Sequence, residues 1–385
     1  MNNYSKILWT LVIGLIIIKL AGVLFFIQEI KSYEDYKIAE NIVLGNGYSE
    51  YKHLGPSALK APLYPLFLSV FIYLFDDPKK IIVIFQLVLF TIISIPFYNS
   101  LKRISGKNAA FIISLIYLLY PSFLIYPFKI ESTSITIPLL IIQFYYLIKH
   151  IKENKCICYF SIISALMFLH QPLSIIFTLF YLIYLKNWNS FARVIIAIVI
   201  LSSPWLIRNY KSFDKIIPTK SPFWMNVYVG MDPEVQKVDY DLIKPEEKKK
   251  LDSLRMAIND VDLEEEYKKL VKPIILNNHQ VYLKIIINNV RQFWFIPNKY
   301  LDEFNYQFII GRVIPSLILN ILTVYCLILL FNQNKKIFYL ILSFYLLYTF
   351  PYAITHASNI RFKLDIEWTQ IALLITIFKR KNNEV

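Results

Sequence analysis

The chain has 385 residues, of which 56% are apolar and only 18% charged, and its mean hydropathy is +0.48. Soluble domains contain roughly 45–50% apolar and about 25% charged residues. The apolar residues here also gather in runs of about twenty, separated by short basic patches. This composition excludes a disordered chain, a collagen, a disulfide scaffold and an ordinary soluble enzyme. The sequence predicts an all-α, multi-pass membrane protein.

The net charge of +14 results from 41 basic and 27 acidic residues. Much of the lysine and arginine lies at the ends of apolar runs, which is typical of residues that orient a membrane protein and contact anionic lipid. Cys156, Cys158 and Cys326 have neither the spacing of a disulfide framework nor that of a zinc site. We therefore expect membrane lipids as partners and no nucleic acid. High Lys, Ile and Asn usage is typical of an AT-rich genome, and the expected location is a bacterial inner membrane.

Apolar runs long enough to cross a bilayer predict about ten transmembrane helices. The further segment Ala61–Phe75 is short and contains Pro62 and Pro65. If it does not cross, the basic loops all fall on one side, as the positive-inside rule requires. We therefore expect it to form an interfacial or re-entrant helix. The ten expected spans lie near residues 7–28, 81–100, 108–127, 132–148, 156–171, 173–186, 191–207, 309–331, 336–353 and 367–379.

This topology places two long polar stretches, Glu29–Lys80 and Tyr210–Phe308, at the outer, extracytoplasmic face. Lys19 is an exception to the distribution of charge, because it lies deep in the first span and its partner is not evident. The chain divides into an N-terminal transmembrane module (1–209) with a first outer loop (29–80), an outer-face helical loop (210–308) and C-terminal transmembrane helices (309–385).

Several carboxylates lie at the outer ends of the expected spans. Lysines in such positions are usual interfacial anchors, but Glu34, Asp35 and Glu131 are not explained in that way. The alternative for Asp35 is a cap on a helix that starts near Tyr36, and for Glu131 a cap on the span that follows it. A carboxylate in such a position can also act as a general base.

Four local strings follow the acidic pair Glu34-Asp35 in chain order. They are Gly45-Asn46-Gly47-Tyr48, Lys60-Ala61-Pro62-Leu63-Tyr64-Pro65, Pro204-Trp205-Leu206-Ile207-Arg208-Asn209 and Arg361-Phe362-Lys363. On this topology, the series resembles the GT-C membrane glycosyltransferases. It is most similar to family 39, with its relatives of the protein O-mannosyltransferases and of the lipid A aminoarabinose transferases.

The resemblance implies a GT-C-type bundle that transfers a sugar from a polyprenyl-phosphate-linked donor to a hydroxyl of a glycan, lipid or protein acceptor at the extracytoplasmic face. Asp35 is expected to be the base, supported by Glu34, with Glu131 as a second acidic group near the sugar or a cation; Glu29 is a further candidate for the base. The expected ligands of the donor phosphate are Lys60, Arg208, Arg361 and Lys363, and the candidate substrate contacts are Tyr64, His170 and Asn209.

Two alternatives stay open at this stage. No ligand set with recognisable metal spacing is present, so no metal ligand is assigned, but a divalent metal beside Glu34 and Asp35 is compatible with the sequence. The alternative function is a transporter or flippase of a lipid-linked sugar. Transporters commonly have paired halves and a substrate site near the midplane, whereas the polar residues here gather on one side.

Overall fold

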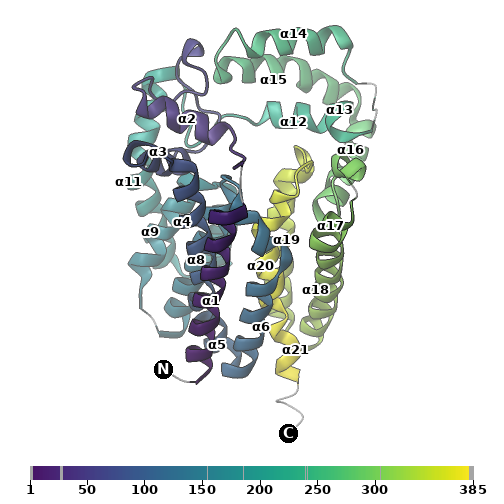
Figure 1. The fold of residues 1–385 in the computed structure, drawn as a ribbon. Helices are drawn as coiled ribbons and strands as arrows, with labels where there is room; N and C mark the ends of the chain where they lie inside the picture. Colours follow the sequence, from purple (N-terminus) through teal and green to yellow (C-terminus); the bar gives the residue numbers. More distant parts are fainter. Residues whose placement is uncertain are drawn as a thin grey trace.

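The protein is an upright bundle of helices, seen in a computed structural model (Figure 1). Both termini lie at one end of the bundle, and helices α2 and α12–α15 lie at the opposite end. Within the described residues there is no β-strand, only one isolated bridge between Ser32 and Ile130. The structure describes residues 3–26, 29–153, 155–184, 186–238, 240, 242–303 and 305–380.

The helices fall into two sets. Those of the bundle are α1 (Asn3–Phe26), α4 (Pro78–Ile92), α5 (Ser94–Ser105), α6 (Lys107–Leu119), α7 (Pro121–Ile125), α8 (Thr133–Glu153), α9 (Ile157–His170), α10 (Leu173–Tyr184), α11 (Trp188–Phe213), α18 (Ile314–Gln333), α19 (Lys335–Ile354), α20 (Arg361–Leu373) and α21 (Ile375–Arg380). The others are α2 (Glu34–Val43), α3 (Leu63–Leu74), α12 (Trp224–Met231), α13 (Pro233–Gln236), α14 (Pro245–Arg255), α15 (Asp260–Asn277), α16 (His279–Trp294) and α17 (Tyr306–Phe308).

Six helices of the described chain are long and apolar enough to span a membrane, and the bent pair α6–α7 makes a seventh if it is counted as one span. All seven coincide with predicted spans. The six are Asn3–Phe25, Pro78–Ser105, Thr133–Glu153, Trp188–Phe213, Tyr306–Gln333 and Lys335–Ile354. The other three predicted spans correspond to the shorter helices α9, α10 and α20–α21, so the count of ten is not confirmed. The segment Ala61–Phe75 contains α3, a short apolar helix of 12 residues.

The bend between α6 and α7 measures 57° and has a local cause. Tyr120 is extended, as the residue before a proline prefers to be, and Pro121 has no N–H to continue the helix. The chain therefore turns at this point and reaches Glu131 through the 3₁₀ turn Tyr126–Phe128. The bend thus brings Tyr126 and Glu131 to the end of the bundle that carries α2.

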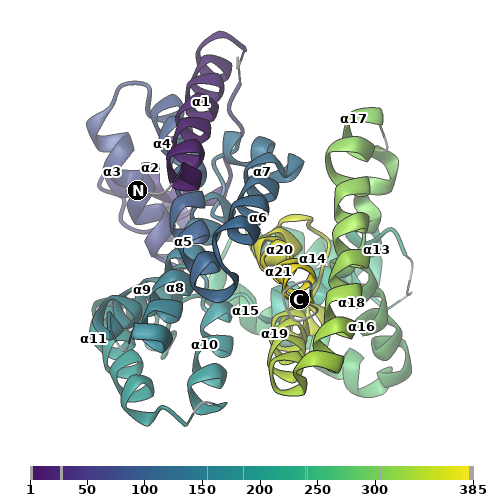
Figure 2. The ribbon, with the colours of Figure 1, turned by 90° about the horizontal axis from the view of Figure 1, so that it is seen from below.

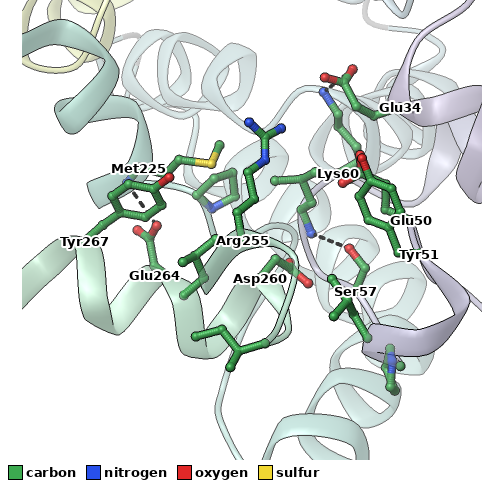
Figure 3. A pocket seen from close by; sticks show the side chains of 17 residues that line it. Glu34, Glu50, Tyr51, Ser57, Lys60, Met225, Arg255, Asp260, Glu264 and Tyr267 are labelled. Carbon is green, nitrogen blue, oxygen red and sulfur yellow. Dashed lines mark hydrogen bonds and ion pairs between the residues drawn. The ribbon is translucent and has the colours of Figure 1, made fainter. Parts of the chain in front are cut away.

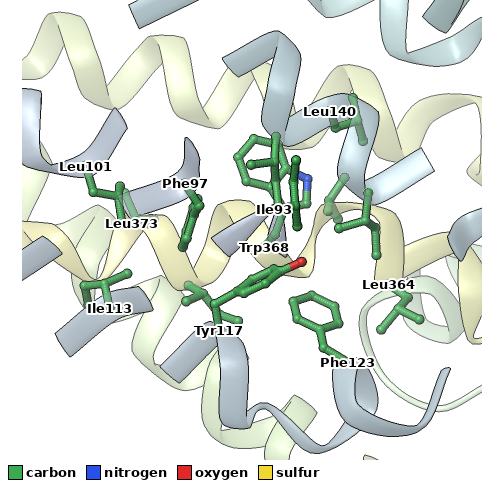
Figure 4. Close-up of a cluster of buried hydrophobic side chains, with 14 of the residues drawn as sticks. Ile93, Phe97, Leu101, Ile113, Tyr117, Phe123, Leu140, Leu364, Trp368 and Leu373 are labelled. Atoms are coloured by element: carbon green, nitrogen blue, oxygen red, sulfur yellow. The ribbon is translucent and has the colours of Figure 1, made fainter. Parts of the chain in front are cut away.

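Helix α20 lies between the N-terminal helices and the α16–α18–α19 group (Figure 2). Its apolar side packs into an aromatic core, in which Trp368 meets Phe97 edge to face at a ring-centroid distance of 6.2 Å (Figure 4). Tyr117 and Phe123, from the bent α6–α7 pair, continue this core at 5.1 Å. The packing fixes the position of α20, and with it the charged residues at its start.

A buried ionic cluster ties α20 to α18 and the turn before it. Arg312 contacts Glu367 at 2.7 Å, and Lys363 contacts the same carboxylate at 3.4 Å. Lys363 also donates to the Ser316 hydroxyl at 2.6 Å. Lys363 is 2% exposed and Glu367 is fully buried. Two cations and one anion are therefore held together away from solvent, where each depends on the others.

Lys19 of α1, whose partner was not evident from the sequence, donates to the Thr91 hydroxyl of α4 at 3.0 Å. Thr91 in turn donates to the carbonyl of Leu87 one turn earlier. A polar contact of this kind holds two spans together in an apolar environment.

We predict that Glu367→Gln strongly destabilises the protein, because Arg312 and Lys363 then lose their shared counter-ion inside the bundle. Breaking a buried ion pair costs about 3–5 kcal/mol. The measurement is thermal unfolding of the detergent-solubilised protein. Glu246→Gln makes the same chemical change at an exposed position of α14 and should leave the unfolding midpoint unchanged. Equal midpoints for both variants would contradict the structural role of this cluster.

Candidate active site

A cavity of about 490 Å³ opens at the end of the bundle that carries α2 and α12. Segments far apart in the sequence meet in it. The first outer loop contributes Asp35 and Lys60, and the loop before α12 contributes Lys220. The segment between α19 and α20 contributes His356, and the first residue of α20 contributes Arg361. The start of α8, the end of α9 and helix α20 complete it with Ser132, Thr133, His170, Gln171 and Asp365.

Asp35 lies in the first turn of α2, is 6% exposed and lines this cavity. The N-cap of α2 is Tyr33, and no side chain caps the helix, so the structure gives no support to a capping role for Asp35. Burial raises the pKa of the Asp35 carboxyl above its usual range, although the positive charges of Lys60 and Arg361 oppose this rise. The result is a carboxylate that is more basic than usual in a site that also contains cations.

Glu34, the neighbour of Asp35, points to a smaller adjoining pocket instead (Figure 3). Its carboxylate lies 3.5 Å from the Lys60 ammonium group. Burial raises the pKa of Glu34, but the charge of Lys60 and hydrogen bonding outweigh this effect, so the pKa is below its usual range. The pocket lies between the first outer loop and α14–α15, which contribute Glu50 and Arg255 respectively. Lys60 lines both the charged cavity, with Asp35, and the smaller pocket, with Glu34, so its positive charge acts on both carboxylates.

Glu131 is not a helix cap; its side chain is bound by other groups. Its Oε1 accepts from Arg361 at 2.8 Å, and its Oε2 accepts from the Tyr126 hydroxyl. The backbone N–H of the preceding residue, Ile130, donates to the carbonyl of Lys31 at 3.1 Å. Glu131 therefore fixes the Arg361 guanidinium at the cavity and lies next to the start of the first outer loop.

Tyr64 and His170, predicted as substrate contacts, also line the cavity. The Tyr64 hydroxyl donates to Gln86 Oε1 at 2.7 Å, and its ring meets the His170 ring edge to face at 6.0 Å. His170 Nε2 lies 3.2 Å from the carbonyl oxygen of Ser132. Together with Asp35, Lys60 and Arg361, they make five predicted site residues that the fold brings to one space.

Arg208, Asn209 and Lys363 are not among the residues that line it. Arg208 donates to the carbonyl oxygens of Ser57 at 2.8 Å and Tyr48 at 2.9 Å, and its guanidinium lies 4.9 Å from the Trp205 ring centroid. Asn209 donates to the carbonyl of Ile217 at 2.8 Å. Lys363 belongs to the buried ionic cluster with Glu367. The Pro-Trp-x-x-Arg-Asn string thus anchors the first outer loop on α11.

Lys220 is a cavity residue that the sequence did not single out. Burial lowers its pKa to about 8, and the positive charges of Lys60 and Arg361 add to this effect. The group therefore stays mainly cationic at neutral pH. No carboxylate of the described chain lies within 4 Å of it, unlike Lys60 and Arg361, which have Glu34 and Glu131 as partners. Its flanking residues, Pro218 and Pro222, are the only local signal in the sequence.

His356, also missed from the sequence, connects the cavity to the outer helices. Its Nδ1 lies 2.9 Å from the Ser358 hydroxyl, and its Nε2 lies 3.3 Å from the Asn226 side chain of α12. Burial lowers the pKa of His356 to about 3, and the charges of Arg361 and Lys299 add to this effect. A neutral imidazole therefore supports the segment that leads into Arg361.

Metal ligands do not gather in this part of the molecule. Within the described ranges, no group of three or more His, Cys, Asp or Glu side chains is placed to hold a metal ion. Asp35 and Glu34 have Lys60 and Arg361 as their charged neighbours instead.

The fold and the cavity define a multi-pass membrane protein with a charged site at one end of its helical bundle. A protein-family model described as dolichyl-phosphate-mannose-protein mannosyltransferase matches residues 59–207. The match confirms the resemblance drawn from the sequence and supports a GT-C glycosyltransferase that uses a polyprenyl-phosphate-linked sugar. It covers Lys60, Tyr64, Glu131 and His170. No curated protein and no solved structure shows a significant match to the chain.

We predict that Arg208→Lys loosens the first outer loop, since the single ammonium nitrogen of lysine cannot reproduce the planar fork whose two separate nitrogens bind the Tyr48 and Ser57 carbonyls. Hydrogen bonds from a charged donor contribute about 1.5–3 kcal/mol. Amide hydrogen exchange over residues 46–57 should therefore accelerate by about tenfold or more. Arg193→Lys, at an exposed position near the other end of α11, is the control and should leave this exchange unchanged. Unchanged exchange in Arg208→Lys would rule out the anchoring role.

Proposed function

We propose that the protein transfers a sugar from a polyprenyl-phosphate-linked donor to an acceptor hydroxyl inside this cavity. The observation that carries the proposal is the convergence of a buried, unusually basic carboxylate, Asp35, with the cations Lys60, Lys220 and Arg361. Such a site provides a proton acceptor for the attacking hydroxyl and positive charge for the departing phosphate. The family match to residues 59–207 supports the same reaction class.

The proposed step is a single displacement. Asp35 accepts the proton of the acceptor hydroxyl while that oxygen attacks the anomeric carbon of the donor. The bond between the anomeric carbon and the phosphate oxygen breaks, and the electron pair leaves with the polyprenyl phosphate. The products are the glycosylated acceptor and the lipid phosphate, with the proton on Asp35. The configuration at the anomeric carbon is inverted.

The phosphate would lie among the cations of the cavity. Arg361 is held in place by Glu131 at 2.8 Å and can still donate from its remaining N–H groups. Lys220 has no carboxylate partner within 4 Å in the described chain, so an incoming phosphate would be its counter-ion. We therefore assign the phosphate to Lys60, Lys220 and Arg361, and not to Arg208 or Lys363, whose donors bind other parts of the protein.

A second cavity, of about 640 Å³, offers a place for the isoprenoid chain. It is lined by apolar residues of α3, α9 and α11, among them Leu66, Leu169 and Leu201. Pro62 and Leu169 line this groove, while their chain neighbours Ala61 and His170 line the charged cavity. The charged cavity and the groove are therefore adjacent, which suits a donor whose phosphate lies in the cavity and whose isoprenoid chain lies in the groove.

The charge distribution supports a site on the extracytoplasmic side. Arg103, after the second predicted span, contacts Glu153 at the end of α8 at 2.9 Å. The basic clusters at 102–107 and 149–155 therefore share one end of the bundle, which also contains both termini (Figure 1). By the positive-inside rule this end is cytoplasmic, and the charged cavity at the opposite end is extracytoplasmic. A cavity at one end favours the enzyme over a transporter with a midplane site.

We predict that Asp35→Asn lowers the rate of sugar transfer by about 10²–10⁴-fold, the range expected for the loss of a general base. The measurement is release of polyprenyl phosphate from a labelled lipid-linked sugar in membranes that contain the variant. Asp76→Asn removes an exposed carboxylate of the same outer loop and should leave transfer unchanged. Full activity of Asp35→Asn at normal expression would remove Asp35 from this role.

We predict that Glu34→Gln shifts the acid limb of the pH–rate profile to lower pH. The negative charge of Glu34 raises the pKa of Asp35, and Lys60, once free of Glu34, lowers it further. The base then stays deprotonated at a lower pH, so activity persists further into the acid range. The measurement is kcat/KM against pH, with Asp76→Asn as the charge-matched control. A shift to higher pH, or an equal shift in the control, would contradict this coupling.

A further inference from the structure

Asp365 is a buried carboxylate that the proposed chemistry does not use. It is 2% exposed, lines the charged cavity, and lies one helical turn beyond Arg361 on α20. The Tyr348 hydroxyl donates to its Oδ2 at 3.3 Å, and Thr133 and Gln171 surround the same carboxyl group. Its Oδ1 has no hydrogen-bond partner within the described chain.

Ion pairing does not account for this residue either. Glu34, Glu131 and Glu367 each have a lysine or arginine within 4 Å, whereas Asp365 has none among the described residues. A carboxylate buried without a counter-ion costs several kcal/mol. A ligand that donates hydrogen bonds would satisfy the free oxygen.

A second unsatisfied acceptor lines the same cavity. His170 is 6% exposed, and its Nε2 lies 2.9 Å from the Thr136 hydroxyl and 3.2 Å from the carbonyl oxygen of Ser132. The Thr136 hydroxyl donates its own hydrogen to that carbonyl at 3.0 Å, so both groups face Nε2 as acceptors. Nε2 therefore carries the hydrogen, and Nδ1 of the neutral ring is an acceptor. Nδ1 has no hydrogen-bond partner in the described part of the chain. Gln171, the next residue, interacts with the Asp365 carboxyl group, and its amide donates to the Tyr352 hydroxyl at 3.5 Å.

The acceptor atoms of Asp365 and His170 suit the sugar of a lipid-linked sugar and not its phosphate. A phosphate offers only acceptor oxygens at neutral pH and is repelled by a carboxylate, so it fits Lys60, Lys220 and Arg361. Sugar hydroxyls donate, and they fit an unpaired carboxylate oxygen and an imidazole nitrogen. On α20, Arg361 and Asp365 are four positions apart, a rise of about 6 Å, which is about the size of a sugar ring next to its phosphate.

We infer that Asp365 and His170 form the subsite of the transferred sugar, bind its hydroxyl groups, and select a polyhydroxylated sugar that has no acidic group. This inference rests on the proposed function, because it assumes that a lipid-linked sugar occupies the cavity. It assigns Asp365 to binding of the donor sugar rather than to proton transfer. An acidic sugar would be excluded by repulsion between its carboxylate and Asp365.

The test compares a donor with its own leaving group. Purified protein is titrated with undecaprenyl phosphate and with undecaprenyl-phosphate mannose, glucose and galactose, and binding is followed by intrinsic fluorescence. We expect wild-type protein to bind at least one hexose donor more tightly than undecaprenyl phosphate. Asp365→Leu should weaken that hexose donor by about 10- to 100-fold, the effect of losing a hydrogen bond to a charged group, and leave undecaprenyl phosphate unchanged.

His170→Phe keeps the ring but removes the acceptor, and it should give the same selective loss, so the test does not depend on Asp365→Leu folding. Thr349→Val is the matched control, because it removes a buried, unpartnered hydroxyl of α19 that is not among the cavity-lining residues. It should change neither affinity. Lys220→Met should weaken both ligands equally.

Three results would overturn the subsite. They are unchanged hexose binding in both variants, an equal loss for undecaprenyl phosphate, and a wild-type protein that binds none of the hexose donors more tightly than undecaprenyl phosphate. A wild-type protein that does not bind undecaprenyl phosphate at all would instead refute the proposed function, and the sugar subsite with it.

Discussion

The cost of burying charge in an apolar bundle is the constraint on which this structure depends, and α20 carries most of it. Every second residue from Arg361 to Glu367 is ionisable. Residues four apart share a helix face, so Lys363 and Glu367 face α18 and Arg312, while Arg361 and Asp365 face the charged cavity. One face is neutralised within the fold. On the other face, Arg361 is paired to Glu131, and Asp365 has no ion-pair partner among the described residues. The charges of the first face therefore stabilise the fold, and those of the second face are available to a ligand.

The outer helices contribute to the site through the backbone of the segment before α20. Asn289 of α16 donates to the carbonyls of Ala353 and Thr355 at 3.0 Å, and Tyr282 donates to that of Ile354 at 2.6 Å. A side-chain carbon at Gly230 of α12 would overlap the Thr355 carbonyl oxygen. The carbonyls exposed where α19 ends are therefore satisfied by side chains of the outer stretch. The helices of 210–308 fix the position of the segment that carries His356 and leads to Arg361, although they contribute few side chains to the cavity.

The sequence predicted most of the architecture because the signals for spans and topology are local. Seven predicted spans match apolar helices, since hydrophobic length is read directly from the chain. The three unconfirmed spans are the short helices α9, α10 and α20–α21. In α20 the charges interrupt the apolar pattern, and their mutual neutralisation with Arg312 depends on tertiary contacts. The partner of Lys19 was not predictable for the same reason, because Thr91 comes from another helix.

For the site, the sequence predicted which types of residue take part, whereas tertiary contacts decide which of those residues can bind a ligand. Arg208 and Arg361 look alike in sequence, as each is an arginine at the outer end of a span. Arg208 is surrounded by carbonyl oxygens of the first outer loop and three aromatic rings, whereas Arg361 is surrounded by carboxylates at a cavity. Three of the five guanidinium N–H groups of Arg208 are bound, to the Ser57 and Tyr48 carbonyls and to the Asn209 side chain, whereas Arg361 donates only one of its five to Glu131 and keeps more donors for a phosphate. The number of donors left over after folding, rather than the motif, therefore determines which cation can stabilise a leaving group.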